Sequence, residues 1–198
     1  MKRLLMYLLF LPFLAVSQNI IGEYETPLGE KFEVHITNPN KKGNFDFLIF
    51  AKSSDAISTE ACLVVSSKKL EYFHSFLLKL KANHVEWIDK LKENNIDNVN
   101  KVIPIKEEKY FAAKFLYGDW QSVHAIYLLP HFKTFPIGHC TILRSSRLVA
   151  FGNKYINSDG FFFLFSKPED FDDLINLVSM DKANEFFNKK KNIDDILK

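Results

Sequence analysis

One stretch of the sequence, from Leu70 to Leu91, has the periodicity of a long amphipathic helix. Apolar and aromatic side chains recur at alternating spacings of three and four residues, which places them on one stripe of a helix. Charged residues occupy the other positions, and Asn94 with Asn95 provides a stop. Because one stripe must be buried, the rest of the chain has to cover it. The stripe consists of Leu70, Phe73, Leu77, Leu80, His84, Trp87 and Leu91.

Short segments typical of β-strands lie on both sides of this helix. Most are rich in β-branched and aromatic residues and are bounded by Gly, Pro, Asn, Asp or Ser. The last of them, residues 161–165, is apolar on both faces, which predicts a central strand that is covered on both sides. In chain order the segments are KFEVHI, NFDFLIFAK, ACLVVSS, EKYFAAKFLYG, QSVHAIYLLP, CTILR, RLVAFGNKYI and FFFLF.

Two helices are expected after the last strand. Ser166 and Glu169 have the spacing of a capping box, Pro168 lies in the first turn, and Ser179 can cap a second helix. The order of segments predicts an α+β fold, with a mostly antiparallel sheet on which one long helix and two C-terminal helices pack. No repeat or linker divides the chain, so residues 18–198 are expected to form a single domain.

The first seventeen residues have the pattern of a secretory signal peptide. Lys2 and Arg3 precede an uninterrupted apolar run, and Ala15 and Ser17 fit a cleavage site before Gln18. The run is shorter than the roughly 20 residues of a membrane-spanning helix. We therefore expect residues 1–17 to be cleaved, the protein to be exported to the periplasm or exterior, and the mature chain to have no membrane anchor.

Charge argues against nucleic acid as a partner. The whole chain has 26 basic and 24 acidic residues, and the leader accounts for two of the basic ones. The mature chain is therefore formally neutral, whereas proteins that bind nucleic acid usually have a concentrated positive surface. A protein or a component of the cell envelope is the more plausible partner, and the oligomeric state is left open.

The two cysteines of the chain have three interpretations. In an oxidising compartment Cys62 and Cys140 would form a disulfide, which is the favoured interpretation. Two inert buried thiols are the second interpretation. Catalysis by Cys140 with a histidine is the third, but the adjacent His139 would point to the opposite face if this segment is a strand.

Other candidate chemistry in the sequence is weak. His124, His131 and His139 could converge on a metal ion if the strand register allowed it, but we expect no metal site. The acids between Glu169 and Asp173 suit the first turn of a helix better than a metal site. Because the sequence contains no GxSxG, HExxH or phosphate-binding glycine motif, we predict no catalytic residue and no cofactor.

Four segments together resemble small exported proteins of Bacteroidetes-type bacteria that have no assigned function. These segments are AVSQ, VEWIDKLKENNI, FLYGDW and SDGFFFLFS. The resemblance implies an envelope or extracellular destination. It implies no activity, substrate or site residue.

The function expected from these observations is that of an exported binding module that is not an enzyme. Exposed aromatic patches mark binding surfaces, so the first candidates for binding are Tyr117, Trp120, His131 and Phe132. The alternative is a hydrolase that uses Cys140 with a histidine, or a metal held by histidines.

Overall fold

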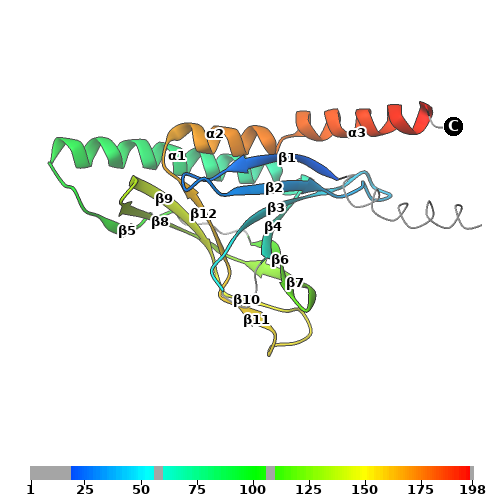
Figure 1. Ribbon diagram of the computed structural model, residues 1–198, viewed down its shortest axis with the longest axis horizontal. Helices are drawn as coiled ribbons and strands as arrows, with labels where there is room; N and C mark the ends of the chain where they lie inside the picture. Colours follow the sequence, from blue (N-terminus) through cyan, green and yellow to red (C-terminus); the bar gives the residue numbers. More distant parts are fainter. Residues whose placement is uncertain (1–18, 56–59, 106–109, 197–198) are drawn as a thin grey trace, which may run out of the picture.

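The computed structural model describes residues 19–55, 60–105 and 110–196 (Figure 1). In these residues a large antiparallel sheet is combined with one long helix, α1 (Leu70–Glu93), and a bent C-terminal helix. The predicted α+β class and antiparallel sheet are confirmed. The two predicted C-terminal helices are the two pieces of the bent helix, α2 (Pro168–Leu177) and α3 (Met180–Ile196). The predicted leader, residues 1–17, lies outside the described residues.

Ten strands of the described chain form the main sheet, and two short ones form a separate hairpin. The main sheet contains β1 (Ile20–Glu25), β2 (Lys31–Ile36), β3 (Asp46–Ser53), β4 (Glu60–Ser66), β5 (Asn100–Val102), β6 (Phe111–Tyr117), β7 (Asp119–Ile126), β8 (Leu128–Phe135), β9 (Gly138–Ser145) and β12 (Phe161–Phe165). The hairpin consists of β10 (Leu148–Val149) and β11 (Asn157–Ser158).

The strands of the main sheet follow the order β5-β8-β9-β12-β3-β4-β6-β7, and β2 attaches the β1-β2 ribbon to β3. Only Tyr127 separates β7 from β8, so a nearly continuous run pairs first with β6 and then with β9. β7 is at one end of the strand order and β8 is near the other end. Because a single residue connects them, the sheet must curl so that its strands share one inner face.

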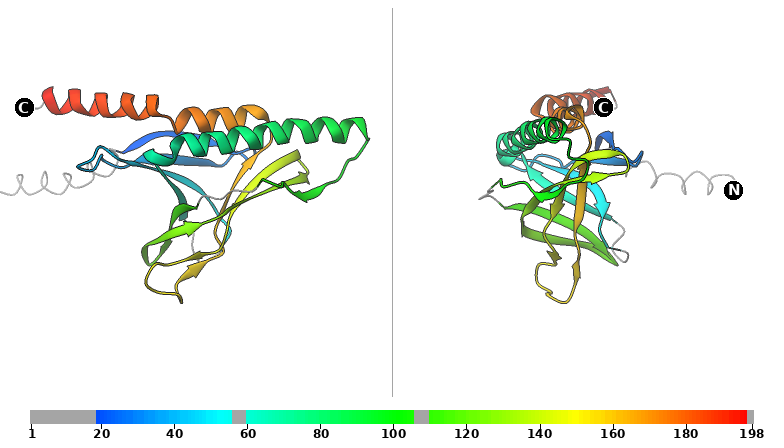
Figure 2. Two further views of the ribbon diagram at one scale, coloured as in Figure 1. Left: turned by 180° about the vertical axis from the view of Figure 1, so that it is seen from behind. Right: turned by 90° about the vertical axis from the view of Figure 1, so that its left-hand side faces the viewer.

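Helix α1 packs on this inner face, and α2 lies beside it on the same side of the sheet (Figure 2). The buried apolar residues of α1 belong to one core cluster with inner-face residues such as Phe47 and Leu63. The predicted stripe is confirmed, except that Trp87 is half-buried and packs edge-on against Phe132 with ring centroids 5.5 Å apart. No helix among the described residues combines the length and apolar character needed to cross a bilayer.

Candidate functional site

The main sheet divides at one edge of β3. One edge of β3 is paired with β4 along its length. β2 and β12 must therefore share the opposite edge of β3. β2 pairs with β3 as far as Ile49, and β12 pairs with it from Lys52 onward. Between these points the carbonyl of Phe50 accepts a hydrogen bond of 2.6 Å from the Tyr24 hydroxyl. A side chain therefore takes the place of a strand at the point where the sheet splits.

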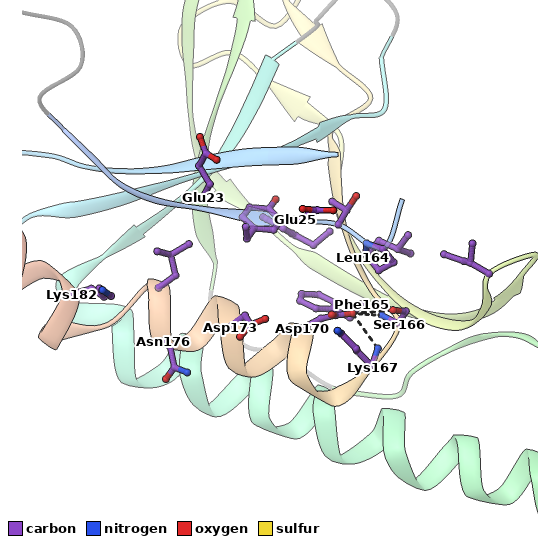
Figure 3. A pocket seen from close by; sticks show the side chains of 16 residues that line it. Glu23, Glu25, Leu164, Phe165, Ser166, Lys167, Asp170, Asp173, Asn176 and Lys182 are labelled. Carbon is purple, nitrogen blue, oxygen red and sulfur yellow. Dashed lines mark hydrogen bonds between the residues drawn. The ribbon is translucent and has the colours of Figure 1, made fainter. Parts of the chain in front are cut away.

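The split opens into a groove of about 640 Å³, shown in Figure 3. It lies between residues 23–27, from β1 and the turn that follows it, and residues 163–167, from β12 and the loop that follows it. Helix α2 lines one side through residues such as Asp173 and Leu177. We call this space the split groove.

The backbone of β12 has hydrogen-bonding groups that point toward the split. Ser54 N donates to Gly160 O at 2.8 Å, which makes Phe161 and Ser53 a non-hydrogen-bonded pair. The backbone groups of Phe162 consequently bond to β3. Those of Leu164, two residues further on, point to the same edge beyond the end of the β3 pairing.

The same alternation applies to β1. Thr26 N donates to Glu30 O at 2.8 Å, so Glu25 and Lys31 are a non-hydrogen-bonded pair. The backbone N–H and C=O of Glu23 and Glu25 therefore point away from β2. The edge of β12 at Leu164 and the edge of β1 at Glu23 and Glu25 thus both lack a partner strand, and both border the split groove.

The rim of the split groove is mainly acidic. Glu23 and Asp173 are exposed and form no ion pair with another described residue, and Glu25 lies 4.0 Å from Lys31. Four carboxylates and the two lysines Lys167 and Lys182 line the groove. Because Lys182 also pairs with Glu185, the rim has an excess of negative charge.

A second hollow, of about 440 Å³, lies on the outer face of the sheet and shares Leu164 with the split groove. Its other apolar lining residues include Leu28, Phe135 and Phe162. The apolar run of β12 predicts a strand covered on both faces. The inner face is buried, whereas the outer face, with the half-buried Phe162, borders this hollow. The run FFFLF and the acids between Glu169 and Asp173 were therefore the sequence signals that lie at this site.

The start of α2 is held in place beside the groove by Asp170. Its carboxylate accepts hydrogen bonds from Ser166 N at 2.7 Å, Ser166 Oγ at 3.1 Å and Lys167 N at 3.1 Å. The capping contact predicted for Glu169 is thus made by Asp170. The interpretation of the acid cluster as helix-terminal charge fits this position, since a carboxylate in the first turn suits the positive end of the helix.

Beneath α2, His84 is fully buried, as expected of a member of the α1 stripe. Its Nδ1 lies 3.0 Å from Thr141 Oγ1, and its Nε2 has no hydrogen-bond partner among the described residues. Burial lowers the pKa of His84, opposed by the Ser166 backbone and the Asp170 carboxylate. Its ring packs edge-on against Phe171, so this neutral imidazole supports the first turns of α2.

The aromatic residues predicted to bind a partner do not form one surface. Tyr117 and Trp120 are exposed in the β6-β7 hairpin, and the Trp120 ring packs edge-on against Phe50. His131 is half-buried. Phe132 has no exposed surface, so its assignment to an interface was wrong. It lies on the inner face of β8, because residues 131–132 continue a strand and do not form the loop that the sequence predicted.

The three candidate metal-binding histidines lie apart. In the β8-β9 pair His139 is opposite Thr134, whereas His131 is three residues earlier on β8 and so faces the other side of the sheet. His124 lies on β7 against Phe151, with ring centroids 4.4 Å apart. No group of three metal-ligating side chains that could hold an ion occurs in the described ranges.

Cys62 and Cys140 are free, and the expected disulfide between them is absent. They lie on β4 and β9, with β3 and β12 in between, which amounts to about 14 Å across three strand spacings. A disulfide requires Cα atoms within about 7 Å. Fold topology therefore excludes the bridge, which the sequence could not show.

The arrangement around Cys140 does not favour a nucleophilic thiol. His139 contacts Thr134 on one face of β9, and Cys140 is buried on the other. Burial and the nearby Asp170 carboxylate raise the pKa of Cys140 to about 11, and burial raises that of Cys62 to about 12. With these raised pKa values, both thiols stay protonated near neutral pH.

We predict that neither thiol reacts with an alkylating reagent at pH 8 while the chain is folded, since only about one Cys140 in a thousand is ionised there. Both should react after unfolding in guanidinium, as measured by intact mass. Ser75→Cys, at an exposed position of α1, is the control that reacts in the folded state. Rapid native labelling of Cys140, or a mass lower by two hydrogens, would contradict the prediction.

Comparison with known proteins adds no family to these observations: no protein-family model matches the chain, and neither the curated proteins nor the solved structures give a significant match.

Proposed function

We propose that this protein is an exported, non-enzymatic binding module whose split groove holds an extended segment of a partner protein. The observation that carries the proposal is the pair of strand edges at the groove, at Leu164 on β12 and at Glu23 and Glu25 on β1. An extended peptide that lies along such an edge gains main-chain hydrogen bonds, and neighbouring hollows accept its side chains.

The surroundings of the edges suit a peptide of particular character. Acidic side chains on the rim favour a basic residue, and the apolar hollow on the other side of Leu164 accepts an aliphatic or aromatic one. The leader supports export to the periplasm or exterior. The buried, protonated thiols and the separated histidines are consistent with binding rather than hydrolysis.

The test is selection of a random-peptide phage library on the purified chain, followed by affinity measurement with the enriched peptides. We expect basic and apolar residues in alternating positions. The double substitution Glu23→Lys with Asp173→Lys should weaken binding by about tenfold or more, because it reverses the rim charge. Glu93→Lys, at the exposed end of α1, is the matched control and should leave the affinity unchanged.

A second variant tests the strand edge itself. Leu164→Pro removes an N–H that points into the groove and leaves the hydrogen bonds to β9, which Phe163 and Phe165 make, in place. Thermal unfolding should show a folded protein that no longer binds the peptides. If no peptide is enriched, or if the enriched peptides bind the rim variants and Leu164→Pro as well as the original chain, the proposed function is wrong.

A further inference from the structure

A long acid-free segment extends from Trp120 to Ser158. Asp119 precedes it and Asp159 follows it, and no aspartate or glutamate occurs in between. The segment carries the four basic residues Lys133, Arg144, Arg147 and Lys154, whereas the remainder of the chain has 22 basic and 24 acidic residues. Arg144 and Arg147 are the only arginines after residue 17. The segment therefore has a net positive charge because it lacks acids, whereas the remainder of the chain is slightly acidic.

The end of this segment forms a protruding tip. β10 and β11 pair through Leu148–Ser158 and Val149–Asn157, and the residues between them project from the sheet (Figure 1). Phe151 is 76% exposed and Tyr155 is 82% exposed, the two highest values among the exposed large apolar and aromatic side chains of the described residues. Exposed rings at a protrusion of this kind are unusual for a surface that faces only water.

Cationic side chains accompany the two rings. Lys154 Nζ lies 5.4 Å from the centre of the Tyr155 ring, and the exposed Arg147 bonds to the Asn157 side chain at the base of the tip. Val149, on the same hairpin, is also exposed. The tip thus combines apolar rings with positive charge and has no acidic residue of its own.

The tip and the split groove lie at opposite ends of the molecule. In Figure 1 the β10-β11 hairpin is at the bottom, and α2 and β1, which line the groove, are at the top. A surface that engages the tip would therefore leave the groove open.

From these observations we infer that the β10-β11 tip docks on an anionic lipid bilayer. Tyrosine and other aromatic rings are favoured at the bilayer interface, and lysine and arginine are attracted to anionic headgroups. A convex tip inserts into an interface of this kind without a matching cavity in the partner. The tip carries Arg147 and Lys154 and no carboxylate, and this charge is complementary to anionic lipid in particular, which makes an anionic bilayer a better match than a neutral surface. The inference does not depend on the proposed peptide groove.

The test is co-sedimentation of the chain without residues 1–17, which retains every described residue, with two kinds of vesicle. One kind is phosphatidylcholine alone, and the other contains about one third phosphatidylglycerol. We expect binding to the anionic vesicles that is at least about tenfold tighter than to the neutral ones and that weakens when salt rises from about 0.1 M to about 0.5 M.

Surface variants then locate the contact. Phe151→Ser with Tyr155→Ser should weaken anionic binding by about tenfold, and Lys154→Glu by about fivefold or more. The controls are Leu78→Ser and Lys92→Glu, both at exposed positions of α1, which should bind as the original chain does. Unchanged thermal unfolding establishes that the variants remain folded.

Three outcomes would overturn the inference. The first is no binding to anionic vesicles, whatever other molecules the chain binds. The second is equal binding to both kinds of vesicle. The third is binding that the tip variants reduce no more than the α1 controls do. Peptide binding by the tip variants in the groove assay should be unaffected, which separates failure here from failure of the proposed function.

Discussion

Replacing Phe171 with alanine should lower the free energy of unfolding by about 3–5 kcal/mol, one of the two largest effects that we expect from a single substitution. Phe171 is fully buried at the start of α2. Its ring stacks on Phe165 of β12 with centroids 4.2 Å apart and planes 11° apart, and it packs edge-on against His84. Alanine would leave a cavity at the junction of α1, α2 and the sheet.

The effect should extend to the split groove, because Phe171 holds α2 against β12. Urea unfolding measures the loss of stability, and peptide affinity measures the effect on the groove. Phe151→Ala is the matched control: it removes the same ring from a position that is 76% exposed, and it should change stability by less than about 0.5 kcal/mol. Equal losses in the two variants would show that α2 is not anchored as described.

Replacing Gly160 with alanine should cost about 2–4 kcal/mol. Gly160 has a φ of +96°, which an L-residue rarely adopts. A Cβ there would lie 2.2 Å from Ser145 Oγ and 3.0 Å from the Ser146 carbonyl oxygen. Ser145 Oγ accepts a hydrogen bond from Phe161 N at 3.0 Å, so moving it leaves a buried donor at the first residue of β12 without a partner.

Gly43→Ala is the control that separates conformational strain from the clash. Gly43 has a φ of +75°, and a Cβ added to it would meet no described atom within 4 Å, so the substitution should cost only about 1 kcal/mol. Denaturant unfolding of both variants measures the difference. If Gly160→Ala were no more destabilising than Gly43→Ala, the packing between β9 and the start of β12 would be looser than these distances require.

Local patterns predicted the helices and most strands well, because their signals lie within a few residues of one another. Helix α1 ends at the predicted asparagines, and Ser179 Oγ accepts a hydrogen bond from Lys182 N, as expected of a cap. Strands β2 and β12 have the predicted bounds. β1 was not predicted, although it provides one side of the split groove.

Pro130 illustrates why one boundary was misplaced. The sequence predicts that a strand ends there, yet β8 continues through it. Its carbonyl accepts a hydrogen bond from Ile103 N, on the side of β5, so its missing N–H is also on that side and costs no bond to β9. The extension of β8 carries Phe132 into the core, and the predicted aromatic interface loses this residue as a result.

The sequence alone determined the α+β class, the burial of the α1 stripe and the unusual apolar character of β12, because spacing along the chain decides which side chains share a face. Only the tertiary structure decided that β2 and β12 compete for one edge of β3, that the cysteines are separated by two strands and that the aromatic tip stands opposite the groove. Strand order and register depend on contacts between residues far apart in the chain, and no local pattern specifies them.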